Sequence, residues 1–286
     1  MKIDFHTHIF DSPVTENRSA YLDDMSFSLL YSGENSKVID HNSLLKSMAE
    51  LNIDYAVAMG FPWEKEKYCE KQNKYFVKAM NESNRRIIPF GSIPLTGKHQ
   101  SDDWAGYIKE IGLAGIGEIA FYNEGLTYKN ADILQEVFAS ALKHSLPVCL
   151  HVSEPVGNDY TGKHCTDLSV LYSIIKDFPG LTIILAHWGG GLLFYELNNN
   201  VRTVFKNIYY DTAASHYLYN DDIFDIAVRI TGSRKILFGS DYPLIDFKRY
   251  FDSIESKINN EEDKKNIFGE NAAAFLKDFI EKKNNA

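Results

Sequence analysis

Six residues of metal-binding type stand where short apolar segments of the sequence end. They are His6, His8, Glu118, His151, His187 and Asp241. Imidazole and carboxylate groups together suit Zn²⁺, with Mn²⁺, Fe²⁺ and Co²⁺ as alternatives. Water bound to such an ion has a pKa of about 7 and supplies hydroxide near neutrality. These residue types indicate metal-dependent chemistry if the fold brings them together.

The first two candidates lie in the segment IDFHTH, where His6 and His8 are separated by one residue. In a β-strand successive side chains alternate, so Asp4 would share a face with both histidines. This pattern alone is weak evidence for a metal site, because an exposed strand can also carry two histidines. We expect Asp4 to be a partner of a histidine N–H and not a ligand.

Eight short apolar segments alternate with segments of helical periodicity. The predicted strands are Lys2–His8, Ile53–Gly60, Ile87–Ile93, Ala114–Ala120, Pro147–Val152, Leu181–His187, Asn207–Thr212 and Lys235–Ser240. The predicted helices include Ser43–Leu51, Tyr68–Asn81, Ala131–His144, Leu168–Phe178 and Asp221–Ile230. Such alternation predicts a parallel sheet.

We interpret residues 1–286 as a single α/β domain, a metallo-dependent hydrolase-like (β/α)₈ TIM barrel. The alternative is an open doubly wound sheet, but no GxGxxG or GxxxxGK[ST] motif follows a strand. Gly189–Gly191 is interpreted as a tight turn into a helix. The connection from Ile9 to Asp40 is long and aperiodic, and we expect it to form a lid over the mouth.

Each candidate also has a structural interpretation. Glu118 could stabilise a helix N-terminus, and Asp241 could cap the helix after Pro243. Separate structural roles explain the six residues together less well than one active site does. Active sites of such barrels are assembled at the C-terminal ends of the strands, and inward positions are otherwise apolar. His216, just beyond the seventh strand, is a weaker candidate facing the mouth.

Composition narrows the class of protein. Hydrophobic residues make up 44% of the chain, which is enough for a large core, and the net charge of −9 gives no support for a nucleic-acid partner. The three cysteines have no CxxC spacing, and neither a leader peptide nor a membrane-spanning segment is evident. We expect a cytoplasmic protein acting on a small molecule, with no membrane partner; whether it forms a homo-oligomer is open.

The ordered set of residues resembles the amidohydrolase superfamily of metal-dependent TIM-barrel hydrolases. The segments HWGGG, FGSDYP and IFGENAAAFL resemble its amidohydrolase-2, decarboxylase-related branch, and the likeness covers essentially the whole chain. By this resemblance His6, His8, His151 and Asp241 would be metal ligands. His187 would be either a ligand of a second metal or an acid/base beside one metal.

Glu118 departs from part of that pattern. Binuclear members of the superfamily often carry a carbamylated lysine at the end of the fourth strand, whereas GEIAFY resembles the bridging glutamate motif of TatD-like hydrolases. We expect Glu118 to contact metal, and one or two ions are both compatible with the sequence.

The main functional expectation is hydrolysis of a small carbonyl compound, such as a cyclic amide, ester or lactone, by metal-activated water. Asp241 would take the proton from that water, and His187 would polarise the substrate or carry a proton. The alternative is a metal-dependent, non-oxidative decarboxylase of an aromatic or enoic acid. A TatD-like nuclease and a barrel that binds a ligand without turnover are weaker hypotheses.

Other mouth residues are candidates for contact with substrate. Trp63, Tyr122, Trp188 and Tyr242 follow strands and would form an aromatic wall, or else cap the core. Arg18 and Lys163 are candidate cations for a substrate carboxylate, although a solvated surface charge is the favoured interpretation of each. Substrate identity cannot be derived from these residues, because fold does not determine function.

Overall fold

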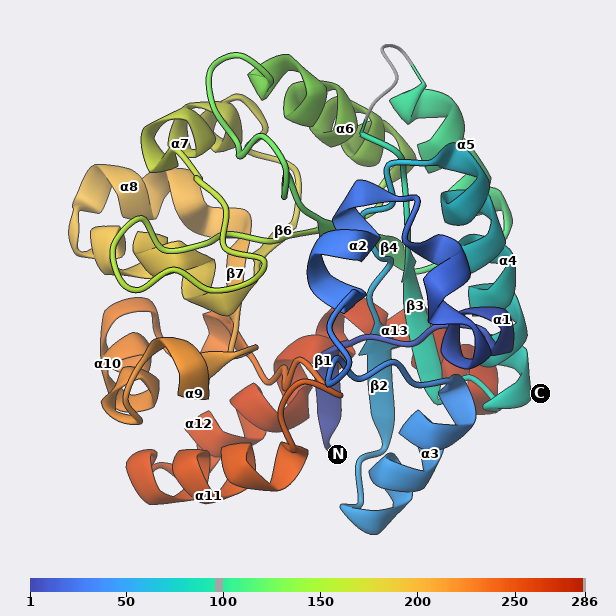
Figure 1. The fold of residues 1–286 in the computed structure, drawn as a ribbon. Coiled ribbons are helices and arrows are strands. Elements are labelled where there is room, and N and C mark those ends of the chain that lie inside the picture. The colour runs from blue at the N-terminus through green and yellow to red at the C-terminus, as the bar shows by residue number, and fades with distance from the viewer. Residues whose placement is uncertain (96–99, 285–286) are drawn as a thin grey trace.

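Eight parallel strands form a barrel surrounded by helices in the computed structural model, which describes residues 1–95 and 100–284 (Figure 1). The strands are β1 (Ile3–Thr7), β2 (Tyr55–Ala58), β3 (Ile87–Gly91), β4 (Gly115–Ile119), β5 (Val148–Leu150), β6 (Ile183–Leu185), β7 (Ile208–Asp211) and β8 (Ile236–Leu237). Each strand pairs in parallel with the next in chain order, from β1 to β8. The predicted TIM barrel is confirmed.

The barrel closes between β1 and the segment that follows β8. The backbone N–H of Phe5 donates to the Phe238 carbonyl at 2.7 Å, and the N–H of Asp241 donates to the His6 carbonyl at 2.9 Å. Thr7 and Tyr242 form a further parallel bridge. The two ends of the strand series are therefore joined by backbone hydrogen bonds, which places Asp241 beside the HxH segment.

Helices follow the strands on the outside of the barrel. The α-helices are α1 (Ser12–Glu16), α2 (Met25–Tyr31), α3 (His41–Glu50), α4 (Glu66–Glu82), α5 (Ser101–Glu110), α6 (Ala131–His144), α7 (Leu168–Asp177), α8 (Asn199–Val204), α9 (Ser215–Leu218), α10 (Asp222–Thr231), α11 (Phe247–Lys257), α12 (Glu261–Lys265) and α13 (Asn271–Asn284). The 3-10 segments are η1 (Arg18–Tyr21), η2 (His187–Leu197), η3 (Phe205–Asn207) and η4 (Ser233–Lys235), and η5 (Asn266–Glu270) is π-helical. All five predicted helices are present. Side-chain caps begin several of them, as where the Asp167 carboxylate accepts the Ser169 and Val170 N–H groups at the start of α7.

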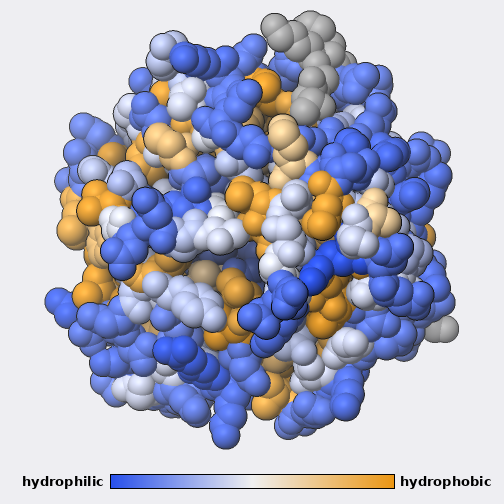
Figure 2. Space-filling view, viewed as in Figure 1, coloured by the Kyte–Doolittle hydropathy of each residue, from blue (hydrophilic) through white to orange (hydrophobic). Residues whose placement is uncertain are grey.

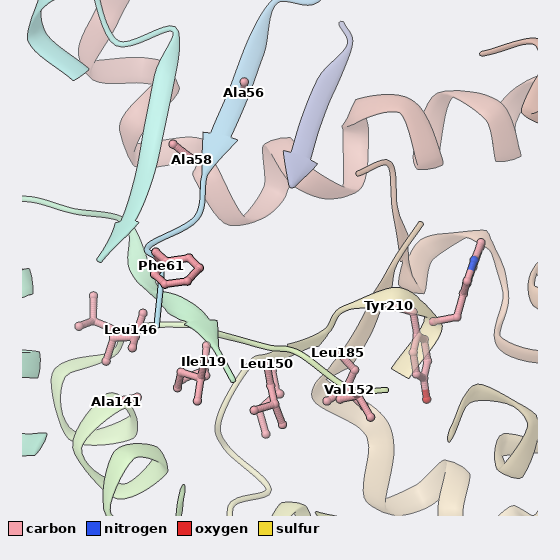
Figure 3. Packing of buried hydrophobic residues seen from close by; sticks show 14 of the residues in the cluster. Ala56, Ala58, Phe61, Ile119, Ala141, Leu146, Leu150, Val152, Leu185 and Tyr210 are labelled. Carbon is pink, nitrogen blue, oxygen red and sulfur yellow. The ribbon is translucent and has the colours of Figure 1, made fainter. Parts of the chain in front are cut away.

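Alternation along each strand divides the core into two layers. Val148 and Leu150 of β5 belong to the outer layer beneath the helices, whereas Cys149 between them belongs to the layer inside the barrel. Figure 3 shows part of the outer layer, with labelled side chains from β2, β4, β5, β6 and β7. Leu276 of α13 joins the inner layer. The inside of the barrel is therefore filled by packed side chains.

The connection after β1 contains α1, η1 and α2 and lies over the mouth, as the lid prediction required (Figure 1). It is attached through aromatic packing, with Phe27 stacked on Trp63 at 4.7 Å between ring centroids. Asp24, fully buried, accepts hydrogen bonds from the backbone N–H groups of Phe27, Glu64 and Lys65. The lid is thus fastened to the loop that follows β2.

Most strands are shorter than predicted at their C-terminal ends. β6 ends at Leu185 and β8 at Leu237, so His187 and Asp241 lie in the loops beyond them. Among the described residues, no helix combines the length and the apolar character needed to cross a membrane.

Candidate active site

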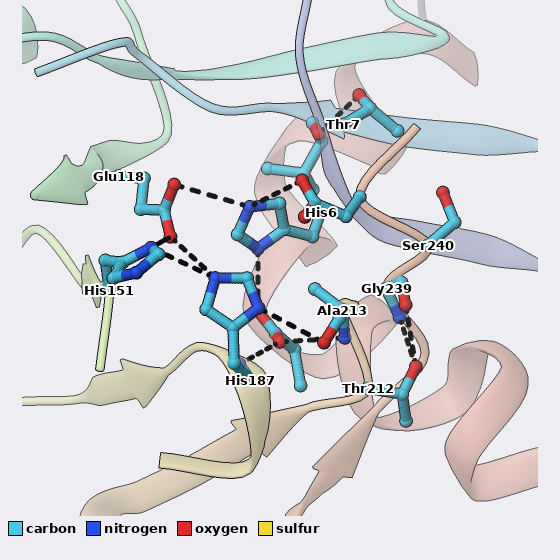
Figure 4. A network of polar contacts seen from close by, with 12 residues as sticks. His6, Thr7, Glu118, His151, His187, Thr212, Ala213, Gly239 and Ser240 are labelled. Carbon is cyan, nitrogen blue, oxygen red and sulfur yellow. Dashed lines mark hydrogen bonds and ion pairs between the residues drawn. The ribbon is translucent and has the colours of Figure 1, made fainter. Parts of the chain in front are cut away.

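The six candidate residues meet at the mouth of the barrel in two groups. His6, His8 and Asp241 form one group, and Glu118, His151 and His187 form the other, with the ligand-type atoms in each group within 4.8 Å of one another. His6, Glu118, His151 and His187 converge from four different strands (Figure 4). The prediction that the strand ends bring these side chains together agrees with the structure.

Glu118 lies between the two groups. One carboxylate oxygen, Oε1, is 2.9 Å from His151 Nδ1 and 3.3 Å from His187 Nε2. The other oxygen, Oε2, is 3.6 Å from His6 Nε2 and 3.8 Å from His8 Nε2. A carboxylate with one oxygen toward each group is placed to contact either of two ions or to bridge both.

The orientation of the histidines shows what the cluster can bind. Nδ1 of His187 lies 3.1 Å from the Ala213 carbonyl, which can only accept, so this nitrogen carries the proton. Nδ1 of His6 is 2.8 Å from the carboxylate of Asp211 in the same way. In the neutral rings, Nε2 of both histidines then directs a lone pair toward the carboxylate of Glu118.

Lone pairs and carboxylates facing one another need a positive charge between them. His151 has Nε2 at 3.2 Å from the Ser153 hydroxyl, so its Nδ1 is the nitrogen that faces Glu118. Nε2 of His8 is 3.1 Å from an oxygen of Asp241. The donor set of four imidazoles and two carboxylates fits one or two divalent cations.

A third group, His6, Cys149 and Asp211, also has the spacing of metal ligands. Cys149 is fully buried in the layer inside the barrel, and in the absence of an ion burial raises the pKa of its thiol to about 12. Asp211 already accepts the His6 N–H. This group therefore supports the ring of His6 and is not a separate site.

Asp211 is the functional residue that the sequence analysis missed. Its buried carboxylate accepts the ring N–H of His6 and the backbone N–H groups of His187 and Ala213. The available signal was its position at the end of the seventh strand, in IYYDT, like the other candidates. It fixes the orientation of two of the histidines.

Asp4 does not have the position that strict alternation predicts. The pairing of β1 with β2 shifts register between Asp4 and Thr7, so Asp4 does not point with His6. Its carboxylate instead accepts the backbone N–H of His6 and both the N–H and hydroxyl of Ser240. The expected contact with a histidine N–H exists, but it is to the backbone and joins β1 to the loop after β8.

Burial and mutual charge shift the ionisation of the cluster. Burial by itself raises the pKa of Glu118, but the charges of His151 and His6 outweigh it and hold that pKa well below the usual range. Burial lowers the pKa of His187, yet the hydrogen bond and charge of Glu118 raise it to about 9. For Asp241, the hydrogen bond from His8 and the charges of His6 and His8 overcome burial and lower the pKa to about 2. Without a metal ion, the charged form of each group is therefore favoured, as the carboxylate for Glu118 and Asp241 and as the imidazolium for His187.

Two of the candidates also have unusual backbone geometry. His187 and Asp241 adopt positive φ angles of 58° and 65°, in the left-handed region that non-glycine residues rarely occupy. Such residues cost on the order of 1–3 kcal/mol each and gather at functional sites. The left-handed stretch continues through Trp188 to Gly191, so HWGGG forms the predicted tight turn into a helical segment.

A cavity of about 920 Å³ opens above the cluster, between the lid and the loops after β4, β5, β7 and β8. The face in Figure 2 is hollowed near its centre, with hydrophobic and hydrophilic residues side by side on the rim. The cavity is lined by His8, Leu29–Lys37, Phe61, Glu118, Tyr122, His151, Asn158–Gly162, His187, Ala214, Tyr217, Leu218, Asp241, Pro243 and Leu244. Its size suits a small organic molecule.

One wall of the cavity is aromatic. The ring of Phe61 lies 5.6 Å from that of Tyr31 and 6.5 Å from that of Tyr122, and Tyr122 packs 5.3 Å from His151. Burial, followed by the charges of Asp241 and Glu118, raises the pKa of Tyr31, and the same causes raise that of Tyr122. Both hydroxyls therefore stay protonated and lie within the electrostatic reach of the cluster.

Of the four aromatic residues expected to contact substrate, Tyr122 alone lines the cavity. Trp63 is buried under the lid, Trp188 packs on Phe224, and Tyr242 stacks on Phe247 while its hydroxyl reaches Ser47. The sequence expectation is corrected for these three. A position after a strand does not determine whether a side chain turns toward the mouth or into the core.

The candidate cations and His216 also lie off the cavity wall. Arg18 donates to the Ser36 carbonyl at 2.7 Å, and Lys163 donates to the carbonyls of Gly157 and Asn158. His216 is paired with Asp221 at 3.3 Å. These residues hold loops in place, and the structure gives none of them a place beside the cluster.

The chain matches one protein family and is similar to several solved structures. Residues 3–277 match the family described as amidohydrolase. No curated protein sequence matches the chain. Among solved structures, 5-carboxyvanillate decarboxylase from Sphingomonas paucimobilis superposes with a TM-score of 0.77 and 15% identity, over 96% of this chain and 98% of that one.

Two further structures are similar at 15–16% identity. The 2,6-dihydroxybenzoate decarboxylase from Rhizobium gives a TM-score of 0.69 over 96% of this chain and 98% of its own, at 15% identity. A dihydroxybenzoic acid decarboxylase from Polaromonas, with bound manganese and the inhibitor 2-nitroresorcinol, gives 0.69 over 96% of each chain, at 16% identity. At this identity the likeness shows the fold.

These findings overturn one expectation and support another. The expectation of a hydrolase of a cyclic amide, ester or lactone is wrong, because the similar structures of stated activity are mostly decarboxylases. A divalent metal is supported by the donor groups and by the manganese in the Polaromonas structure. Because the family match extends from residue 3 to residue 277, the chain belongs to the amidohydrolase family.

Proposed function

We propose that the protein is a metal-dependent, non-oxidative decarboxylase of an aromatic acid. The observation that carries the proposal is the cavity itself, which has the donor cluster at its floor and the row Tyr31, Phe61 and Tyr122 along one wall. A flat ring can lie against such a wall while its polar substituents face the cluster. The decarboxylase activities of the similar structures support the same choice.

The reaction replaces a carbon–carboxylate bond by a carbon–hydrogen bond, so it consumes one proton and releases CO₂ without consuming water. A divalent ion held by the cluster would supply positive charge that fixes the substrate oxygens and draws electron density from the ring. Asp241 faces the cavity and is the group placed to hold the incoming proton, because one of its two oxygens stays available when the other binds an ion; His187 could hold a proton only while its Nε2 binds no ion. Ala213 fixes the ring of His187 so that Nε2 points to the cavity.

The identity and number of the ions form a second part of the proposal. Zn²⁺ suits the ligands, and Mn²⁺ or Fe²⁺ suits them also; the manganese of the Polaromonas structure favours testing Mn²⁺ first. We propose two ions, because Glu118 directs one oxygen toward each donor group. Metal analysis of wild type should give two equivalents per chain, falling to one in Glu118→Gln. One equivalent in both proteins contradicts the bridging role.

The activity is tested by CO₂ release. Protein loaded with Mn²⁺ or Zn²⁺ is incubated with a panel containing 2,6-dihydroxybenzoate, 5-carboxyvanillate, salicylate and several amides, esters and lactones. We expect CO₂ and the decarboxylated ring in equal amounts from at least one acid, and a loss of at least about 10²-fold in Asp241→Asn. Asp225→Asn, on the exposed face of α10, is the matched control. Cleavage of an amide or ester with no CO₂ from any acid refutes the proposal.

Two remaining expectations stay predictions. They are a small molecule as the partner in place of nucleic acid, and a location in the cytoplasm.

A further inference from the structure

The wall of the active-site cavity is poor in cations. Among the described residues that line it, Lys37 is the lysine and no arginine is present, whereas the acidic side chains are Glu34, Glu118, Asp159 and Asp241. Lys37 is exposed, on the outer part of the lid. Among the described lining residues, a substrate carboxylate therefore finds no buried guanidinium or ammonium group.

Two tyrosine hydroxyls are available where a cation would otherwise be expected. Tyr31 reaches the cavity from the lid helix α2, and Tyr122 reaches it from the loop after β4. Their rings are held in place by Phe61 between them. Neither hydroxyl makes a hydrogen bond to another of the described residues, although both feel the charges of Glu118 and Asp241.

We propose that the hydroxyls of Tyr31 and Tyr122 donate hydrogen bonds to the anionic oxygen atoms of the substrate, a flat hydroxylated aromatic acid with one carboxylate. The inference rests on the decarboxylase function proposed above and names its substrate class. A tyrosine O–H is protonated near neutrality and can donate one hydrogen bond to a carboxylate or phenolate. Because Tyr31 belongs to the lid, the binding site is complete only when the lid lies over the mouth.

The charged side chains on the cavity wall favour a substrate with only one carboxylate. Beyond the donor cluster, the charged residues of the wall are Glu34, Lys37 and Asp159, and all three are exposed, so a second carboxylate in the buried part of the cavity has no cationic side chain of the described lining beside it. Burying a carboxylate without a charged partner is costly, and like charges nearby add to that cost. A monocarboxylate such as 2,6-dihydroxybenzoate should therefore bind more tightly than a dicarboxylate such as 5-carboxyvanillate.

The test compares conservative variants of the metal-loaded protein. Binding of 2,6-dihydroxybenzoate and of 5-carboxyvanillate is measured by calorimetry, and CO₂ release is followed in parallel. Tyr31→Phe and Tyr122→Phe keep the ring packing and remove only the hydroxyl, and each should weaken binding of 2,6-dihydroxybenzoate about tenfold or more. Wild type should bind 5-carboxyvanillate at least tenfold more weakly. Tyr21→Phe is the control, since Tyr21 lies in the lid against Trp63 and Tyr68, away from the cavity.

The outcomes separate this inference from the proposed function. Wild-type affinity in both cavity variants, or a larger loss in Lys37→Gln than in either of them, overturns the tyrosine assignment even if CO₂ is released. Tyrosine-dependent binding without CO₂ from any acid of the panel sustains the assignment and refutes the decarboxylase. If neither acid binds to wild type, both proposals fail.

Discussion

The buried carboxylate of Asp211 links three parts of the active site. It accepts the ring N–H of His6 and the backbone N–H groups of His187 and Ala213. Such a partner fixes the tautomer of a metal-binding histidine and raises its basicity. At the scale of single residues, the chemistry thus depends on a side chain that lies behind the donor groups.

Replacing that carboxylate should weaken metal binding without unfolding the barrel. In Asp211→Asn the amide can present either a donor or an acceptor to Nδ1 of His6, so the ring no longer holds one tautomer. We expect metal affinity to fall about 10–100-fold, measured by competition with a chromogenic chelator. Asp132→Asn, at the start of α6 and away from the cluster, is the control. An unchanged affinity shows that Asp211 only supports the fold.

At the scale of elements, the lid depends on one buried carboxylate. Asp24 accepts the N–H of Phe27 at the start of α2 and the N–H groups of Glu64 and Lys65 in the loop after β2. It therefore joins the lid to the barrel by hydrogen bonds that solvent does not reach. The aromatic stack of Phe27 on Trp63 and the contacts of Asp23 with Lys65 and the Tyr68 hydroxyl add to this attachment.

Removal of this carboxylate should loosen the lid before it affects the barrel. Asp24→Ala leaves three backbone N–H groups without their acceptor, at a cost of about 1–3 kcal/mol. We expect faster limited proteolysis between residues 12 and 37 and a raised KM, with a smaller change in kcat. The control is Glu16→Ala, in which an exposed carboxylate at the end of α1 in the same lid is lost, a change worth about 0–1 kcal/mol. Equal proteolysis of the two variants argues against Asp24 as the fastening residue.

The elements themselves were largely predictable from sequence, because hydrophobic periodicity reports burial. All eight strands and the helices named from periodicity are present, and the six candidate donors meet at the mouth. The rule that strand ends carry the site depends only on topology, so it held although β6 and β8 are shorter than predicted.

The predictions that failed concern the direction of side chains and irregular backbone. The register shift in β1 turned Asp4 away from His6, and no periodic pattern in a short strand announces such a shift. Trp63 and Trp188 follow strands as Tyr122 does, yet packing under the lid and against α10 draws them into the core. Tyr31 was not recognised, because its contribution depends on how the aperiodic lid folds over the cavity.

At the scale of the whole molecule, the donor cluster gathers residues from the two ends of the chain. His6 and His8 come from the first strand and its end, Glu118 and His151 from the middle, and Asp241 from the loop after the last strand. An ion bound by them would connect elements that are otherwise joined through strand pairing. Folding and metal binding should therefore be thermodynamically linked, since the unfolded chain has no preformed site.

Removal of metal should lower the melting temperature. At a free Mn²⁺ concentration about 100 times the dissociation constant, each ion that binds to the folded state alone contributes about 2.7 kcal/mol, which for a domain of this size is a shift of roughly 5 °C per ion. We expect this shift in a chelator-treated sample on addition of Mn²⁺, and its loss in His8→Ala, which lacks one donor. His41→Ala is the matched control, because His41 is also buried but pairs with Glu82 and Tyr75 outside the site. It should keep the full Mn²⁺-dependent shift whatever its own stability. A melting temperature of wild type that does not respond to Mn²⁺ contradicts the metal site, because ions bound by these donors only in the folded state cannot leave the unfolding equilibrium unchanged.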